Sequence, residues 1–460
     1  MELVERLRAI YRIIDERGLF IAPENDLVFS PDKRLAINAN GSESVELAKE
    51  SYNSNLLFAL LAGIMKSGTM IFYGPPGAGK TTTSELVGHF LYGMSLDDIQ
   101  KATIYGHPEQ TKEEMIARHD LGEMMAGVEK ILKREFMESP VGIIDEMPRL
   151  PPGKLSILYQ LIDRGFCKVA SEVVKRPEGP IYMTSNAADS GSHPVPLPFL
   201  DRVDVAVITP HLNPFFIPNF DSFGNTELNG SLEERLNIPN ELRIDQKKDL
   251  QEIRKQILSV KIDPDVLYRL IVFVAEINYC DMASETVDKK TKGHLLFKTP
   301  ARGLCDGCHY KANICAYTDN GISPRTYRAI LAYSRALAWW RGKDKVSAEE
   351  LEQVIPFTTW HKIALTRTLL DKKPVYINDK INAVRHIYRE TSQTVDKLKD
   401  IIKEYDGIIN IVSRFVAGEE IDPEHVRVTI ASQIESLKNI DSVVKFPLAT
   451  TLVNLYKAAA

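Results

Sequence analysis

The stretch Ile71-Phe72-Tyr73-Gly74-Pro75-Pro76-Gly77-Ala78-Gly79-Lys80-Thr81-Thr82-Thr83 connects an apolar run, residues 69–73, to a helical pattern at residues 84–87. It contains the phosphate-loop pattern G-x-x-x-x-G-K-[ST]. Glycines allow backbone N–H groups to approach phosphate oxygens, while the lysine and the hydroxyl reach the outer phosphates and Mg²⁺. We therefore expect an ATP site with Mg²⁺, formed by Gly74, Pro75, Pro76, Gly77, Ala78, Gly79, Lys80, Thr81 and Thr82.

Composition limits the classes of protein to which the chain can belong. The 460 residues are 44% hydrophobic and 26% charged, with a net charge of −5. This length indicates about two to four domains. The acidic balance makes a nucleic-acid partner unlikely, since such proteins are usually basic. No apolar run reaches the ~18 residues of a membrane span. The first six residues lack a hydrophobic signal core, so we expect a cytoplasmic protein.

Five short β-rich runs are separated by helical stretches. They lie at residues 69–73, 102–105, 141–144, 181–184 and 205–208. Strands that alternate with helices are typical of a parallel sheet with crossover connections. The sequence thus predicts an α/β core with a five-stranded parallel sheet.

The third of these runs ends in two carboxylates, Asp145 and Glu146. In a phosphate-loop enzyme the first would hold Mg²⁺ through water, and the second would orient and deprotonate the attacking water. The alternative is a solvated acidic pair at the end of a strand.

The segment Asp145-Glu146-Met147-Pro148-Arg149-Leu150-Pro151-Pro152 resembles the D-E-x-x-R-x-P-P run of the MoxR group of AAA+ ATPases. The resemblance runs from about residue 50 to 370 and suggests an archaeal- or viral-type member with a cysteine-bearing lid insertion. Two features depart from the family: Val203 replaces a phenylalanine, and residues 281–318 are inserted. Residues 112–140 lie where the family carries its helix-2 insert, and here we expect more helix than hairpin. Further matches occur at Thr184-Ser185-Asn186, Leu200-Asp201-Arg202-Val203-Asp204, Gly321-Ile322-Ser323-Pro324-Arg325, residues 346–351 and residues 360–363.

The resemblance implies an AAA+ P-loop core, a helical lid and a ring, expected to be a hexamer, that remodels or matures client proteins. A von Willebrand factor A domain protein is the expected partner. Asn186 would position the attacking water, Arg202 would act in trans as an arginine finger, and Arg325 would contact the γ-phosphate from the lid. The alternatives are a turn asparagine, a surface ion pair of Arg202 with Asp201 or Asp204, and an ordinary first-turn arginine.

Four of the five cysteines, Cys280, Cys305, Cys308 and Cys315, lie in or beside the inserted segment. A C-x-x-C turn lets two thiolates converge, and four thiolates suit structural Zn²⁺ or a [4Fe–4S] cluster. His294 and His309 could replace one of them. Disulfides and buried free thiols are the alternatives.

We expect four parts along the chain: an N-terminal lead-in at 1–50, the ATPase core at 51–225, the lid at 226–370 and a C-terminal helical domain at 371–457. We expect a helix at the start of the lead-in, followed by turn-rich chain. We also expect breaks at Gly407 and at residues 418–423 of the C-terminal domain, with helices from Glu424 and about Phe446.

Two rival functions remain open. One is a motor of the related helicase branch in which the cysteines form a zinc module that grips DNA. The other is a redox sensor in which an iron–sulfur cluster gates the lid.

Overall fold

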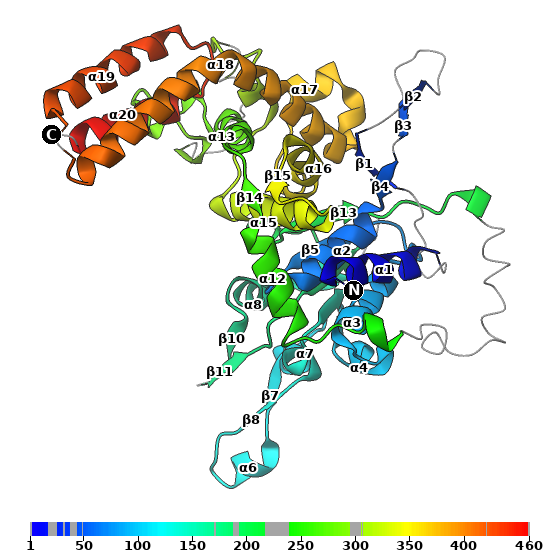
Figure 1. The fold of residues 1–460 in the computed structure, drawn as a ribbon. Helices are drawn as coiled ribbons and strands as arrows, with labels where there is room; N and C mark the ends of the chain where they lie inside the picture. Colours follow the sequence, from blue (N-terminus) through cyan, green and yellow to red (C-terminus); the bar gives the residue numbers. More distant parts are fainter. Residues whose placement is uncertain are drawn as a thin grey trace. The chain divides into compact units, whose positions relative to one another are not determined.

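A computed structural model of the chain describes residues 2–16, 25–30, 33–36, 44–47, 49–169, 172–186, 193–216, 239–294, 305, 307–419 and 421–458 (Figure 1). The chain forms two compact units. The first comprises Met1–Lys261 with Arg328–Lys345, and the second comprises Ile262–Tyr327 with Val346–Ala460. The chain crosses from one unit to the other within three elements: β14 (Lys261–Ile262), α15 (Pro324–Trp340) and β15 (Lys345–Val346).

The first unit is built on the predicted parallel sheet. Its spatial order is β13-β5-β12-β9-β6, so the first strand of the sheet lies between the fifth and the fourth. All four pairings are parallel. The carboxyl ends of β5, β9 and β12 therefore lie at one edge. This confirms the predicted fold class. The strands are β5 (Thr69–Tyr73), β6 (Thr103–Tyr105), β9 (Gly142–Asp145), β12 (Ile181–Ser185) and β13 (Val205–Ile208).

Helices pack against this sheet because their sequences offer apolar surface to it. Every residue of α2 (Ser54–Ile64) is buried, and Asn53 caps the helix by accepting from Leu56 N. Tyr182 of β12 is fully buried and donates its hydroxyl to Ala59 O of α2. Further helices of this unit are α1 (Leu3–Glu16), α3 (Lys80–Tyr92), α4 (Leu96–Lys101), α8 (Pro152–Arg164), α9 (Leu197–Leu200), α12 (Asp249–Ser259) and the single turns η1 (Met147–Arg149), η2 (Pro214–Phe216) and η3 (Asn240–Leu242).

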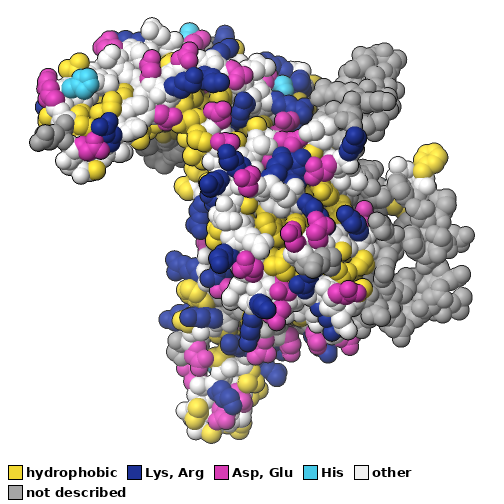
Figure 2. All heavy atoms as spheres, in the orientation of Figure 1, with side chains coloured by type: hydrophobic (Ala, Val, Ile, Leu, Met, Phe, Trp, Pro, Cys, Tyr) yellow, Lys and Arg dark blue, Asp and Glu magenta, His cyan; other side chains and the backbone are white. Residues whose placement is uncertain are grey.

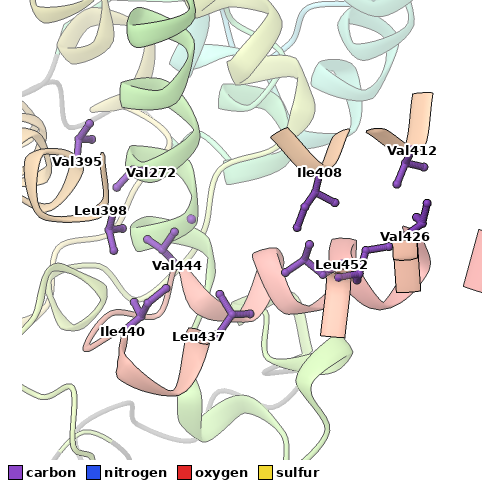
Figure 3. Packing of buried hydrophobic residues seen from close by; sticks show 12 residues of the cluster. Val272, Val395, Leu398, Ile408, Val412, Val426, Leu437, Ile440, Val444 and Leu452 are labelled. Carbon is purple, nitrogen blue, oxygen red and sulfur yellow. The ribbon is translucent and has the colours of Figure 1, made fainter. Parts of the chain in front are cut away.

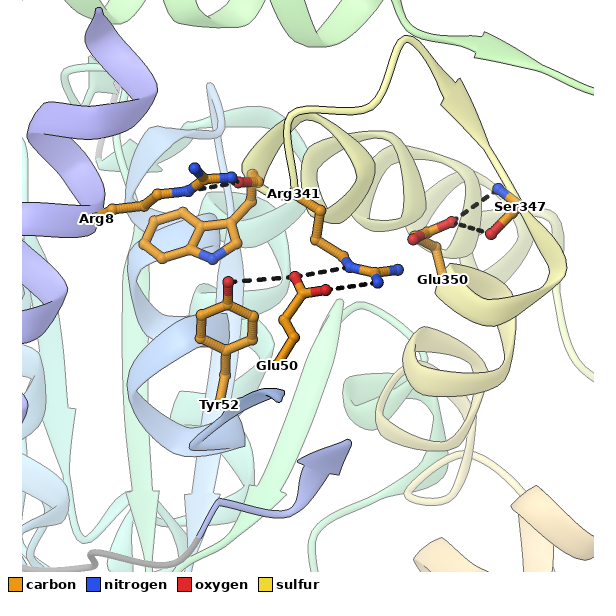
Figure 4. Close-up of polar contacts among 7 residues, drawn as sticks. Arg8, Glu50, Tyr52, Arg341, Ser347 and Glu350 are labelled. Carbon is orange, nitrogen blue, oxygen red and sulfur yellow. Dashed lines mark hydrogen bonds and ion pairs between the residues drawn. The ribbon is translucent and has the colours of Figure 1, made fainter. Parts of the chain in front are cut away.

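The lead-in contains strands that the sequence did not reveal. After α1, β1 (Leu27–Phe29) pairs with β4 (Glu50–Tyr52), and β2 (Lys33–Ala36) pairs with β3 (Ser44–Leu47). Glu50 fastens β4 to the chain just after α15 through two hydrogen bonds from Arg341, of 2.9 and 2.7 Å (Figure 4). Arg8 of α1 donates to the carbonyl oxygen of Trp340, the last residue of α15, at 2.9 Å.

Residues 112–140 contain more residues in three short helices than in strands, as expected, but two of its strands form a hairpin that the sequence did not indicate. β7 (Ala117–His119) pairs antiparallel with β8 (Ile131–Lys133), and α6 (Leu121–Met125) lies at the far end of the hairpin (Figure 1). A strand of three residues shows too little alternation of apolar and polar side chains to be recognised in the sequence between short helical turns. Those turns are α5 (Lys112–Met115) and α7 (Glu135–Glu138). A second antiparallel pair, β10 (Phe166–Val169) with β11 (Glu172–Lys175), follows α8.

The second unit is helical. Its core joins Val272 and Ala275 of α13 (Pro264–Asn278) to side chains of the last three helices, including Leu398, Ile430 and Leu452 (Figure 3). Those helices are α18 (Lys380–Val416), α19 (Pro423–Ser436) and α20 (Lys445–Ala458). The expected break at Gly407 is wrong, since α18 runs through it. One glycine costs a helix about 1 kcal/mol. The burial of Ile408 and Val412, which follow Gly407 in the helix, can offset this cost.

Shorter elements complete the second unit. They are η4 (Asp281–Ala283), η5 (Val287–Lys289), η6 (Lys292–His294), η7 (Ile314–Tyr317), α16 (Ala348–Thr359), α17 (Arg367–Lys372), η8 (Pro374–Ile377) and η9 (Leu437–Asn439). Within the parts of the chain that the structure describes, none of the helices combines the length and apolar character that crossing a membrane would need.

Candidate active site

The phosphate loop lies between β5 and α3, where the sequence predicted it. Gly77 and Gly79 have φ angles of 74° and 78°, a region that other residues enter at a cost. Gly74 is needed for a different reason, because a Cβ there would lie 2.4 Å from Thr209 O. Gly79 precedes the first helical residue, Lys80, so the N–H groups of the α3 N-terminus face the loop. This arrangement can bind an anion.

Lys80 connects the loop to the neighbouring strand. Its ammonium donates to Gly74 O at 2.9 Å, Pro75 O at 2.6 Å and Asn186 Oδ1 at 2.7 Å. Burial lowers the pKa of Lys80, and the charges of Asp145 and Glu146 oppose that shift. The lysine therefore carries a partly desolvated charge beside the loop, the position in which it can bind phosphate.

Asp145 at the end of β9 faces the start of α3. Its Oδ1 accepts from Thr81 Oγ1 at 2.8 Å and from Thr184 Oγ1 at 2.6 Å. Mg²⁺ prefers oxygen ligands, and the hydroxyl and carboxylate here are such a pair within hydrogen-bond distance, so these residues fit the ion. Glu85, one turn after Thr81 on α3, has a pKa raised by burial and by the charge of Asp145.

Glu146 has an unusual backbone and two side-chain partners. Its φ of 50° lies in the left-handed region, and its N–H donates to Thr184 Oγ1 at 2.9 Å. Asn186 Nδ2 donates to Glu146 Oε1 at 3.1 Å, while Arg149 Nη1 lies 2.7 Å from Glu146 Oε2. Strained conformations of this kind persist at functional sites where several contacts fix them. Lys80, Asn186, Glu146 and Arg149 thus form one continuous series of contacts.

Arg202 lies after α9 and contacts α8. Its Nε is 2.7 Å from Asp163 Oδ2, and its guanidinium carbon lies 4.8 Å from the centre of the Tyr159 ring. It also donates to Pro198 O. An ion pair is present, as the sequence alternative proposed, but Asp163 is the partner that the structure reveals.

Arg325 belongs to the second unit. It is the second residue of α15, and its N–H donates to Ser323 Oγ at 3.2 Å. Asn278 of α13 holds the preceding turn, since its Nδ2 donates to Ile322 O at 2.9 Å and its Oδ1 accepts from Ile322 N at 2.7 Å. The turn that carries Arg325 is therefore fixed within the lid.

The cysteine-rich segment does not support the predicted zinc or iron–sulfur site. Over the described residues, no three or more His, Cys, Asp or Glu side chains are arranged to hold a metal ion. Among the described residues, Cys280, Cys305, Cys308 and Cys315 form no disulfide, and His309 lies 2.8 Å from Asp441.

A buried lysine lies beside this group of thiols. The ammonium of Lys292 donates to Cys315 O at 2.8 Å and to Thr318 Oγ1 at 2.7 Å. Burial lowers the pKa of Lys292 to about 8, and the nearby thiols, Cys315 first, oppose the shift. Cys308 and Cys315 also pack against a small core of Tyr310, Val443 and Phe446. Two of the four thiols therefore lie at the edge of a small apolar core, and a buried ammonium contacts the backbone of one of them.

Sequence reasoning missed two residues of the site. Thr184 joins Asp145 to the backbone of Glu146, and Arg149 pairs with the Glu146 carboxylate. Arg149 stands in the quoted D-E-x-x-R segment, so its spacing of three residues was a usable signal. Thr184 stands in the quoted Thr184-Ser185-Asn186 match, but a threonine in a buried strand is ordinary and gave no sign of a role for its hydroxyl.

Comparisons with known proteins agree with this geometry. Residues 69–203 match the family described as "AAA domain (dynein-related subfamily)", and residues 311–378 match "AAA lid domain". A crystal structure from Cytophaga hutchinsonii, described as a candidate ATPase, superposes with a TM-score of 0.54 at 17% identity, covering 83% of this chain and 94% of that one. No curated protein matches the sequence. The sheet order, the phosphate loop and the two matched regions agree: residues 69–203 are similar to an AAA domain, and residues 311–378 are similar to an AAA lid.

Proposed function

We propose that the chain is a Mg²⁺-dependent ATPase of the MoxR group that works as a ring and remodels or matures partner proteins. The observation that carries the hydrolytic part is the series of contacts from Lys80 through Asn186 to Glu146. It joins a phosphate-binding cation, a polar side chain for the attacking water and a carboxylate base at one sheet edge.

Each residue has a role in the proposed hydrolysis. Lys80 would bind the β and γ phosphates, and Thr81 and Asp145 would hold Mg²⁺, which when bound would neutralise charge on the phosphates. Glu146 accepts the proton of the attacking water through its carboxylate. Asn186 orients that water, since its amide contacts both Lys80 and Glu146.

Ring formation follows from the proposed role of Arg202. An arginine finger acts on nucleotide held by a neighbouring subunit and can contribute ~10³–10⁵ in rate. To do so, Arg202 must leave Asp163, to which it is paired at 2.7 Å. Both side chains are about one-fifth exposed, so exchange of this ion pair for a contact across subunits carries a modest cost. Arg325 would contact the γ-phosphate from the lid.

Complementation tests the ring. Arg202→Ala should bind ATP and hydrolyse it slowly, whereas Lys80→Ala should bind it poorly. Mixed rings should recover part of the lost activity, because one subunit supplies the finger and its neighbour the intact loop. If light scattering confirms mixed assembly and activity stays at the sum of the two variants, Arg202 does not act in trans.

The remodelling role is supported by the resemblance to the MoxR group. Its test is a pulldown with the Glu146→Gln variant, which should trap a client in the presence of ATP. Recovery of a von Willebrand factor A domain protein would support the proposal. Stimulation of the ATPase by DNA would instead favour the helicase branch. Figure 2 gives that branch little support, because basic and acidic side chains are interspersed on the face it shows.

A further inference from the structure

We infer that Arg149 is a positioning residue for ATP hydrolysis, which holds the carboxylate of Glu146 so that one defined oxygen takes the proton. The inference rests on the proposed function and adds a residue to which no hydrolytic role has been assigned above. The observation behind it is the ion pair between Arg149 Nη1 and Glu146 Oε2, which are 2.7 Å apart.

The local backbone delivers Arg149 to this position. Residues 147–149 form a single 3-10 turn, η1, in which Arg149 N donates to Glu146 O at 2.9 Å. Side chains three residues apart eclipse one another in such a turn, so Arg149 lies over Glu146. Met147 and Leu150 are fully buried and hold the turn in the core.

The backbone of Glu146 is fixed from the opposite side. Thr184 Oγ1 accepts from its N–H, and a Cβ on Gly106 would lie 2.4 Å from its carbonyl oxygen. The left-handed φ of 50° is therefore imposed by neighbours on β12 and at the end of β6. With the backbone fixed, the remaining freedom of Glu146 is rotation of its side chain.

The two carboxylate oxygens have different partners. Oε2 is paired with Arg149, whereas Oε1 accepts from Asn186, whose own Oδ1 accepts from Lys80. Oε1 thus lies on the side of the phosphate loop and is the oxygen placed to receive a proton. Arg149 acts on the far oxygen, which stops rotation of the carboxylate and keeps Oε1 facing the loop.

Kinetics of three variants test this role. Arg149→Ala should lower kcat by about tenfold to a hundredfold, the scale of a misplaced catalytic group. The KM for ATP and the Kd of a fluorescent ATP analogue should change less than about threefold, because the proposed action of Arg149 is on the carboxylate of Glu146 and not on the phosphate loop. Arg149→Lys keeps a cation near Oε2 and should recover part of kcat. Arg243→Ala, which removes an exposed arginine at the end of η3, is the control and should behave like the wild type.

Three results would overturn the inference. They are an unchanged or raised kcat for Arg149→Ala, a loss of kcat that Arg149→Lys does not relieve, and a loss of assembly in proportion to the loss of rate. The last would assign Arg149 to a contact between subunits. Glu146→Gln separates this inference from the proposed function: if that variant still hydrolyses ATP, the assignment of the base is wrong. If it is inactive while Arg149→Ala is fully active, only the role of Arg149 fails.

Discussion

Replacing Thr184 by Val removes the hydroxyl that joins the two acidic residues of the site. That hydroxyl donates to Asp145 Oδ1 at 2.6 Å and accepts from Glu146 N at 2.9 Å. Thr184 is 1% exposed, so water cannot take its place without rearrangement. Valine has nearly the same shape, which confines the change to the two hydrogen bonds.

The expected cost follows from those two bonds. A hydrogen bond to a charged group contributes ~1.5–3 kcal/mol and a neutral one about 1 kcal/mol. Asp145 keeps its bond from Thr81, so we expect the lower part of this range, about 2–3 kcal/mol of unfolding free energy in total. The kcat for ATP should also fall about tenfold or more, because Glu146 loses a contact that fixes its backbone.

Thr184→Ser is the matched control, since it keeps the hydroxyl and loses one buried methyl. It should cost about 1 kcal/mol and leave kcat near the wild-type value. Urea denaturation measures both free energies. Trp339 and Trp340 lie in the first unit and Trp360 in the second, so fluorescence in a Trp360→Phe background reports the unit that carries the site. If Thr184→Val lies within about 0.5 kcal/mol of the wild type and keeps its kcat, the reasoning is refuted.

Three further substitutions test other parts of the structure. Arg341→Ala should destabilise the first unit by about 2 kcal/mol, because it removes the bidentate partner of Glu50. The control Lys66→Ala breaks an ion pair with Glu178 in which both side chains are more than half exposed, and it should cost under about 1 kcal/mol. Equal losses of unfolding free energy in urea would contradict this prediction. Gly106→Ala should lower kcat, because the new Cβ would lie 2.4 Å from the carbonyl oxygen of Glu146. The control Gly153→Ala has open space around its Cβ and should keep its kcat. A fully active Gly106→Ala would show that the turn at Glu146 can shift. Lys80→Ala should weaken ATP binding itself, which calorimetry measures, and wild-type affinity would remove Lys80 from the phosphate site.

The sheet and the positions of most residues of the candidate site could be predicted because their signals are local. The phosphate loop needs glycines and a lysine at fixed spacing, and Gly77, Gly79 and Lys80 supply them within one turn of chain. Buried parallel strands show as continuous apolar runs, so all five were visible in the sequence. Asp145 ends one of those strands and Asn186 follows another, and the two strands pair, so the topology brings these residues to the same edge.

Other features depend on distant partners and left no local signal. The strands of the lead-in are three or four residues long, and Glu50 is held by Arg341, far away in the sequence. The path of α18 through Gly407 is decided by packing against α13 and α19. The cysteine spacing suggested a metal, but it could not show that the ammonium of Lys292 lies buried beside Cys315. The ion pair of Arg202 with Asp163 on α8 likewise joins residues distant in the sequence.

The central claim is that Glu146 is the base for ATP hydrolysis at a site where Lys80 and Asn186 hold phosphate and water. The most direct test is the rate of phosphate release by Glu146→Gln, measured together with its affinity for ATP. The amide keeps the shape and the contact with Asn186 but cannot accept the proton, so ATP should bind as tightly as to the wild type. Turnover should fall by about 10²–10⁴-fold. Phosphate release at the wild-type rate by a variant that binds ATP normally would contradict the account.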